Sequence, residues 1–401
     1  MTHDKPEWYP KAYLAETGGA LETDREKIFD PALVQYSRAF RRVPPTYDTA
    51  HETAWYAAAR EGVLAMLLSV VAASAWRDSL VLMGSSLLRS WLGDLARAPH
   101  DLDFAVRPVT VAANDAFAAE QFAAIIAAAS VAPVASGAVI AADRIVVDDI
   151  WAYDRVPGKR IVFPWHVPGL PNSDSAAQID FVFGKTLFTE PQETVVTVGV
   201  STHTVLAATP EESLAWKVHH LITDSYPMGK DLYDAVLLGE VVDLPWSLLK
   251  SVLMTDEWYR DHGYKQPGIT FGFMEWDDFV REYPHVTGTN SEWYSRLLAA
   301  LAPTFAERER EVAELQGEVT ELQHEIAERE REIGETMKTM PNAAPPRTST
   351  PTNGGKGWFI GSDSPASTFP PSENAPPEKG TVSLVRRALG VFHAKITRRK
   401  K

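Results

Sequence analysis

The sequence predicts an α+β protein, with a mixed sheet in its first half and helices in its second. Helical and strand-like patterns alternate between about residues 50 and 303, and residues 211–283 are mostly helical in pattern. Strands that are followed by a separate run of helices are typical of the α+β class. A chain of 401 residues is long enough for two or three domains of ordinary size.

The periodicity of apolar residues predicts the order of the elements in the first half. The longest apolar stretch lies in the first helix and is too short to span a membrane comfortably, which indicates a buried helix. The predicted elements are a helix at 50–76, a strand at 79–83, a helix at 85–92, a strand at 101–106, a helix at 112–128, and strands near 139–147, 160–165 and 178–183.

The composition excludes several classes of protein. The chain has no cysteine, which rules out a disulfide scaffold, a cysteine-ligated zinc or iron–sulfur site and a cysteine nucleophile. We expect a cytoplasmic protein, since no signal peptide pattern is visible. The net charge is −14, but residues 381–401 contain seven basic and no acidic side chains, so the rest of the chain carries −21. An acidic body argues against bulk binding of nucleic acid.

Three zones follow the globular part. Residues 306–338 are rich in Glu and Arg, and their apolar residues recur in steps of three and four, interrupted at Arg329. This heptad pattern predicts a helix that either forms a homodimeric coiled coil or packs back on the body. Residues 339–380 contain nine prolines among small polar residues, which predicts a disordered linker. Residues 381–401 predict a basic amphipathic tail helix that suits an anionic membrane surface, a nucleic acid or an acidic protein, or that has no specific partner.

Residues that suit phosphate and metal binding lie in the first half. Gly84 and Ser85 form a turn between a strand and a helix, where backbone N–H groups and a hydroxyl can hold phosphate oxygens. Asp101 and Asp103 are two residues apart on a strand, so their side chains share one face. Two adjacent carboxylates repel each other unless a cation lies between them, and Mg²⁺ is the natural occupant. By itself, the pair is also typical of a solvent-facing strand edge.

A third carboxylate lies on a later strand. Asp180 stands within the apolar stretch 177–184, where a single acid must be paired, bound to a metal or strained. Asp148 and Asp149 follow another apolar stretch and are alternatives for the same role. We favour Asp180 because its strand is more continuously apolar.

A second set of charged residues follows in the helical half. Thr209 is suited to begin a helix, and Lys217 lies two turns into that helix, where it can reach phosphate as a point charge. Asp231 and Asp234 share a face of the next helix. An ordinary exposed lysine and an acidic pair favoured by the helix dipole are the alternatives.

The glycine–serine turn and the acidic pair resemble the first motif of the nucleotidyltransferase superfamily with a polymerase-beta-like palm. More narrowly, they resemble that of the AbiEii/AbiGii toxin family, which includes the MenT toxins. The family pairs a Gly-Ser or Gly-Gly turn with a later Asp-x-Asp. Gly84 and Ser85 match the turn, and Asp101 and Asp103 match the acidic pair. Arg97 stands where an arginine is common in the family.

The later motifs also follow the family's order. The family has a helical lysine, matched here by Lys217, and then Arg-Asp-x-x-Asp, matched by Asp231 and Asp234. Lys230 replaces the arginine, which keeps the charge but loses the planar bidentate fork. The resemblance covers about residues 81–240.

The resemblance implies the domain organisation and the reaction. It implies a palm domain at 50–200 after an N-terminal extension at 1–49, and a helical domain at 201–305 that completes the active site. The implied activity is a Mg²⁺-dependent nucleotidyl transfer, with Mn²⁺ as an alternative metal, from an NTP to a hydroxyl acceptor. The predicted catalytic residues are Asp101, Asp103, Asp180, Lys217 and Asp231. The predicted metal ligands are Asp101, Asp103 and Asp180, and the predicted nucleotide-binding residues are Gly84, Ser85, Arg97 and Lys217.

The resemblance further implies the toxin half of a bacterial toxin–antitoxin or phage-defence pair. Transfer RNA 3′ ends or other RNA would then be acceptors, and a separately encoded antitoxin would be a partner. Two other hypotheses are a nucleotidyltransferase that modifies protein or makes an oligonucleotide signal, and a non-catalytic nucleotide-binding scaffold tethered by its C-terminal arm. Three mutually repelling acids would bring no benefit to a scaffold. The tail also predicts a peripheral position at the membrane.

Overall fold

The computed structural model describes residues 27–29, 40–42, 44–151, 156–224, 227–262 and 276–339. The predicted linker beyond Thr339, the predicted basic tail at 381–401 and most of the extension at 1–49 lie outside the described residues. Contacts divide the chain into two units, Met1–Glu330 and Arg331–Lys401. The first holds the sheet and most of the helices, and the second is described only for the last turns of its helix.

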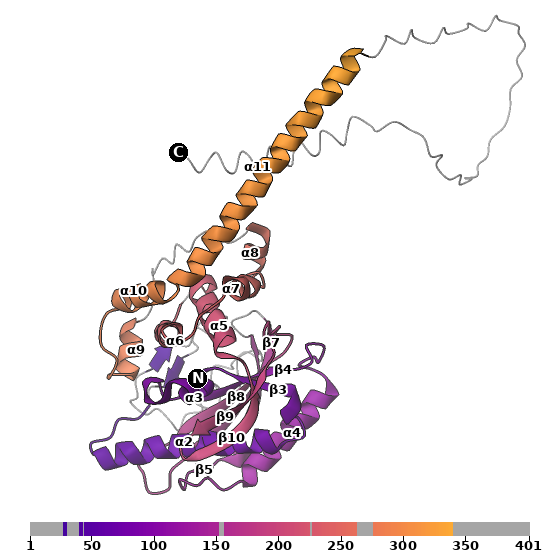
Figure 1. Ribbon diagram of the computed structural model, residues 1–401. Coiled ribbons are helices and arrows are strands. Elements are labelled where there is room, and N and C mark those ends of the chain that lie inside the picture. Colours follow the sequence, from indigo (N-terminus) through magenta and orange to yellow (C-terminus); the bar gives the residue numbers. More distant parts are fainter. Residues whose placement is uncertain are drawn as a thin grey trace, which may run out of the picture. The chain divides into compact units, whose positions relative to one another are not determined.

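A mixed eight-stranded sheet forms the centre of the first unit (Figure 1). Its strands are β3 (Leu80–Met83), β4 (Asp101–Val106), β5 (Val139–Ile140), β6 (Val146–Trp151), β7 (Pro157–His166), β8 (Ser175–Val182), β9 (Gln192–Val198) and β10 (Ser201–Ala207). The order is β5-β7-β8-β4-β3-β10-β9, and β6 also pairs with β7. The pairs β4–β8 and β3–β10 are parallel, and the others are antiparallel. A separate ladder joins β1 (Lys27–Phe29) and β2 (Phe40–Arg42).

Two helices cover one face of this sheet, α2 (Ala50–Ala73) and α4 (Ala116–Val131), as Figure 1 shows. Their apolar side chains and those of the strands form the first hydrophobic core. By length and composition alone α2 is apolar enough to cross a membrane, but half of its apolar window is buried inside the fold. Its buried residues line the core, so the prediction of a buried helix is confirmed.

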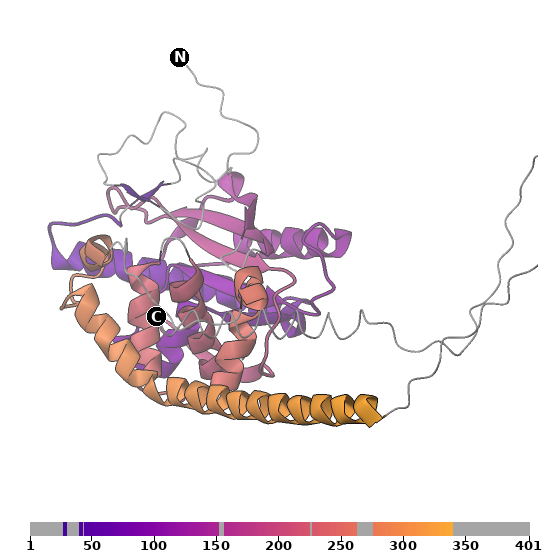
Figure 2. The same cartoon turned by 90° about the horizontal axis from the view of Figure 1, so that it is seen from above.

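The remaining helices follow the sheet and enclose a second core. After α3 (Ser85–Leu92), which links β3 to β4, they are α5 (Pro210–Thr223), α6 (Gly229–Gly239), α7 (Trp246–Leu253), α8 (Glu257–His262), α9 (Trp276–Glu282), α10 (Asn290–Ala300) and α11 (Ala302–Thr339). Leucine, valine and aromatic side chains of α5, α6, α7, α9 and α10 pack together in this core. The last helix, α11, is continuous (Figure 2). The α+β class, with a mixed sheet followed by a helical region, is confirmed.

Two stretches differ from the prediction. The strand expected at 139–147 is wrong, because a 3-10 turn at Ala142–Arg144 separates β5 from β6. The hairpin of β9 and β10 was not predicted, although the valines and threonines of residues 194–198 are typical of a strand. Gly199 turns this hairpin with a φ of 58°, a conformation that favours glycine.

Candidate active site

The predicted acidic residues meet where β4 lies between β3 and β8. Asp101 begins β4, and Asp103 is in register with Met83 of β3 and with Asp180 of β8. Partners in register on neighbouring strands lie about 4.8 Å apart and point to the same face. Asp180 therefore stands beside Asp103. Asp148 lies on β6, two strands further away.

The turn after β3 brings the backbone at Gly84 close to the carboxylate of Asp103. Gly84 has a φ of 76°, and a Cβ at this position would lie 2.0 Å from Oδ2 of Asp103. Ser85 is the first residue of α3, and its buried hydroxyl has no hydrogen-bond partner among the described residues. Ser86 donates from Oγ to the carbonyl oxygen of Asp101 at 2.9 Å and so ties α3 to the start of β4. The turn thus places a helix N-terminus and an unused hydroxyl beside the acidic pair.

We expect Gly84→Ala to destabilise the fold and to disturb the site. The added methyl group would clash with Asp103 in addition to the strain of a positive φ, so the free energy of unfolding should fall by about 2–4 kcal/mol. Gly93→Ala is the matched control, since Gly93 has a φ of 58° with nothing within 4 Å of an added Cβ. Urea unfolding measures both variants. Equal losses would show that the close approach to Asp103 has no energetic consequence.

Asp180 is held by an arginine of the neighbouring strand. Arg160 of β7 is in register with Asp180 and donates from Nε to Oδ1 at 2.8 Å and from Nη2 to Oδ2 at 2.7 Å. Both side chains are buried. Within the described part of the chain, no three His, Asp or Glu side chains are grouped so as to hold a metal ion. The Asp180 carboxylate, which is predicted as a metal ligand together with Asp101 and Asp103, is thus paired with Arg160.

The two carboxylates of β4 differ in their electrostatic environment. Burial raises the pKa of Asp103 well above its ordinary value, and the negative charges of Asp101 and Asp180 raise it further. Burial would also raise the pKa of Asp101, but the positive charges of Lys230 and Arg97 outweigh it and bring this pKa below its ordinary value. A cation beside the pair would relieve the repulsion that disfavours ionised Asp103.

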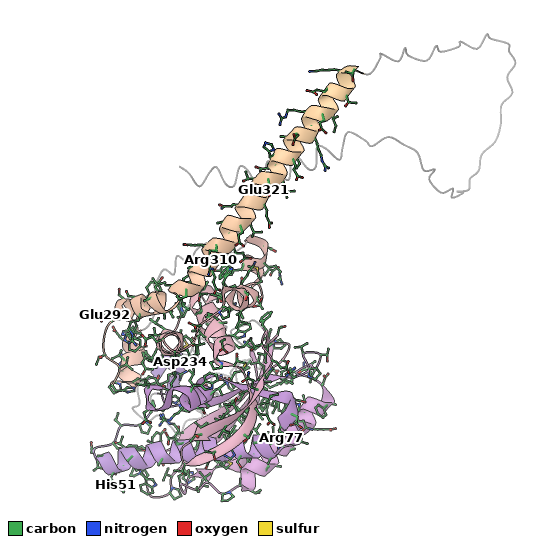
Figure 3. The ribbon with its side chains drawn as sticks, viewed as in Figure 1. His51, Arg77, Asp234, Glu292, Arg310 and Glu321 are labelled. Atoms are coloured by element: carbon green, nitrogen blue, oxygen red, sulfur yellow. The ribbon has the colours of Figure 1, made fainter. Side chains whose placement is uncertain are left out.

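A buried charge network joins the helical half to the segment before β4. The Nζ of Lys217 on α5 lies 2.6 Å from Oδ1 of Asp231 and 3.0 Å from Oδ2 of Asp234, both on α6. Arg97 donates from Nε to Oδ1 of Asp234 at 3.1 Å and from Nη2 to Oδ2 at 3.0 Å. Asp234 is labelled in Figure 3, at the centre of the helical half. Arg97 and Lys217 therefore both pair with Asp234, which was not among the predicted site residues, and Asp231 joins the network through Lys217.

The network shifts the pKa values of Lys217 and Asp231. Burial would lower the pKa of Lys217, but Asp231 and Asp234 outweigh it and raise this pKa. Burial would raise the pKa of Asp231, yet the adjacent Lys217 holds it well below its ordinary value. An acid with so low a pKa is a weak proton acceptor. Asp231 is therefore better suited to orient Lys217 than to remove a proton from the acceptor hydroxyl.

This pair predicts how stability depends on pH. Because the pKa of Asp231 is lower in the folded chain than its ordinary value of 3.8, its stabilising effect is complete above that value and is lost as the pH falls through the folded pKa. We expect the difference in unfolding free energy between wild type and Asp231→Asn to shrink steadily below about pH 4. Urea unfolding at a series of pH values measures it. A difference that stays constant in acid would contradict the pairing.

The position of Lys217 depends on how α5 begins. The Thr209 hydroxyl caps the helix by accepting from the backbone N–H of Glu212 at 3.2 Å. The buried Glu212 carboxylate accepts from the backbone N–H of Thr189 at 2.9 Å and from Nε1 of Trp216 at 2.8 Å. The start of α5 is thereby tied to the loop before β9. The helix start at Thr209 was predicted from the sequence, whereas the role of Glu212 was not.

Three further charged residues of the site were not among the predicted site residues. Asp234 was identified in its motif but not as the partner of Arg97, and Lys230 acts on the β4 carboxylates through its charge. Arg160 carries no motif, and its only signal is a basic residue within an apolar strand. Arg97 was predicted to bind nucleotide, but the structure shows it bound to Asp234.

The family of the nucleotidyl transferase AbiEii toxin, type IV toxin–antitoxin system, matches residues 66–350, more than half of the chain. No curated protein matches. Among solved structures, the chain is similar to MenT4, a nucleotidyltransferase toxin from Mycobacterium tuberculosis H37Rv, with 16% identity and a TM-score of 0.37 over 64% of this chain and 95% of that chain. The chain belongs to the AbiEii family of nucleotidyltransferase toxins of type IV toxin–antitoxin systems.

Proposed function

We propose that the chain transfers a nucleoside monophosphate from an NTP to a hydroxyl group of an acceptor and releases pyrophosphate, with Mg²⁺ as its metal. The observation that carries this proposal is the position of Asp101 and Asp103, which share one face of β4 beside the turn at Gly84 and Ser85. Carboxylates on one side and a helix N-terminus on the other suit the metal and the phosphates of one NTP.

The residues present fit a divalent metal at the β4 pair. Asp101 and Asp103 are half-buried, and a cation would offset the repulsion between them. Mg²⁺ is bound through one or two carboxylates, and the phosphates of the substrate supply further oxygen ligands. When bound there, the metal would neutralise charge that develops on the triphosphate. Asp180 is left out of this ligand set, because Arg160 holds both of its oxygens.

The remaining residues would bind the phosphates of the nucleotide and orient the ammonium group of Lys217. The hydroxyl of Ser85 and the N-terminus of α3 can accept a phosphate group without displacing another partner. An ammonium has three N–H donors, and Asp231 and Asp234 take two from Lys217, which leaves one for a phosphate oxygen. Asp231 and Asp234 thus aim Lys217 at the substrate, while Arg97 holds Asp234 in place.

We further propose RNA as the acceptor, with transfer RNA 3′ ends as the first candidates, and a cytoplasmic site of action. Membership of the toxin family supports the proposal of a target that is essential to the cell and of a separately encoded cognate antitoxin. The absence of cysteine agrees with a reducing compartment. Because the body of the chain is acidic, we expect a small contact area on the RNA rather than an extended one.

The acceptor can be identified by labelling. Purified full-length chain is incubated with Mg²⁺, cell lysate and each of the four NTPs labelled at the α-phosphate, and the products are treated with ribonuclease or with protease. Label that ribonuclease releases supports an RNA acceptor. Label that only protease releases would replace RNA by protein as the acceptor, and labelled oligonucleotides without an acceptor would indicate a signal product. No incorporation with any NTP would contradict the proposed transfer.

A further inference from the structure

The outer part of α11, residues 312–330, presents a long exposed surface. Its first turns are fixed to the helical half, since Thr304 donates to the carbonyl oxygen of Leu244 at 2.6 Å and Glu307 accepts from the N–H of Trp246 at 2.9 Å. From residue 312 to residue 330, every side chain is exposed except one that is half-buried. Figure 3 shows the side chains around Glu321 extending from the helix.

The apolar residues of this part form one stripe. The residues Val312, Leu315, Val319, Leu322 and Ile326 alternate in steps of three and four. Leu315 is 50% exposed and Leu322 57% exposed. An isolated helix has little stability of its own in water, and most helices in proteins depend on packing of their apolar face. A stripe of this kind therefore needs a partner.

The residue types along the stripe favour a particular kind of partner. If Val312 is position a of the heptad, every a position is β-branched (Val312, Val319, Ile326, and Ile333 in the continuing sequence), and Leu315 and Leu322 occupy d. β-Branched residues at a combined with leucine at d favour two parallel strands. In a parallel pair of identical helices, each of these apolar residues lies opposite its own copy.

The flanking charges select between the two orientations of such a pair. The g positions are Glu311, Glu318, Glu325 and Glu332, and the e positions are Gln316, Gln323 and Glu330. An antiparallel pair would place g beside g, so that glutamates face glutamates along the seam. A parallel pair places g beside e, so that two of the glutamates face glutamines. The third glutamate faces Glu330, next to Arg329 at position d, whose positive charge offsets the repulsion.

We propose that this stripe is the seam of a parallel, two-stranded coiled coil with a second copy of this chain. The outer part of α11 is thus an interface that joins two catalytic bodies. Position d holds Arg329 in both copies, and a charged residue in the seam fixes the register of the two helices. This inference does not depend on the proposed reaction.

The oligomeric state of the full-length chain tests the seam. We expect the wild type to sediment as a dimer over a dilution series, and Leu315→Lys/Leu322→Lys to sediment as a monomer. The matched control is Ala313→Lys/Thr320→Lys, which adds the same two charges to exposed positions outside the stripe and should remain a dimer. A monomeric wild type would overturn the proposal, and so would a seam variant that stays dimeric.

The orientation is tested by a single introduced cysteine, because the chain has none of its own. In a parallel pair, Leu315→Cys lies opposite its own copy and should form a disulfide-linked dimer under mild oxidation. In an antiparallel pair centred on Leu322, the two cysteines would be about 20 Å apart and could not join. Ala313→Cys, outside the stripe, should not cross-link. Absence of cross-linking by Leu315→Cys in a dimeric chain would overturn the parallel arrangement.

Discussion

Asp103→Asn is expected to reduce nucleotidyl transfer about a thousandfold or more while making the fold more stable. The carboxylate is a proposed metal ligand, and a metal ion contributes several kcal/mol of transition-state stabilisation. In the absence of metal, the same carboxylate is half-buried and is repelled by Asp101 and Asp180. Its replacement by a neutral amide should raise the free energy of unfolding by about 0.5–2 kcal/mol. Transfer of label from an α-labelled NTP measures the loss of activity. Thermal unfolding without Mg²⁺ measures the gain in stability.

Addition of Mg²⁺ separates this explanation from simple damage to the site. The wild type should be stabilised by Mg²⁺ through binding to the folded state, and Asp103→Asn should respond much less. Asp149→Asn is the matched control, since Asp149 is an exposed carboxylate that pairs with Lys159 on the sheet away from β4. It should retain both transfer and the response to Mg²⁺. A variant at Asp103 that keeps its Mg²⁺ response would remove this residue from the ligand set.

Asp234→Ala is expected to lower the free energy of unfolding by about 3–5 kcal/mol. This side chain is 2% exposed and pairs with both Arg97 and Lys217, so its removal leaves two buried cations with half of their counter-charge. Transfer activity should also fall, because Lys217 loses one of the two acids that orient it. Chemical denaturation of the wild type and the variant measures the loss of stability.

A double variant identifies the cause of that loss. In Asp234→Ala/Arg97→Met, one of the uncompensated cations is replaced by an apolar side chain, so the double variant should be more stable than Asp234→Ala alone. Asp94→Ala, which removes an exposed acid paired with Arg89, is the surface control and should have little effect. If Asp234→Ala were no more harmful than Asp94→Ala, the buried network would not hold α6 to the segment before β4.

Local features of the site could be predicted from the sequence because they depend on neighbouring residues. The helix at 85–92 and the strand at 101–106 have the predicted bounds. A glycine turn precedes the helix, and the strand begins with alternating acidic and apolar residues. Thr209 begins α5 for the same kind of reason, through a hydroxyl that caps its own helix. Family motifs then place the acids on these elements.

Pairings across the fold could not be predicted in this way. Arg97 and Asp234 are 137 residues apart, and nothing in either segment indicates that one binds the other. Arg160 reaches Asp180 only because β7 and β8 pair in one register, and a shift by one residue would point the two side chains to opposite faces. The apolar context of Asp180 predicted an acid that is paired, bound to a metal or strained, but it did not distinguish among these, and the structure shows a pair with Arg160.

The most direct measurement of the central claim is the rate of label transfer from an α-labelled NTP by four forms of the full-length chain. The forms are the wild type, Asp103→Asn, Lys217→Met and Asp149→Asn. We predict similar rates of transfer by the wild type and by Asp149→Asn, and strongly reduced rates by the variants at Asp103 and Lys217. Transfer at the wild-type rate by either of those two variants would contradict the assignment of catalysis to the acids of β4 and the lysine of α5.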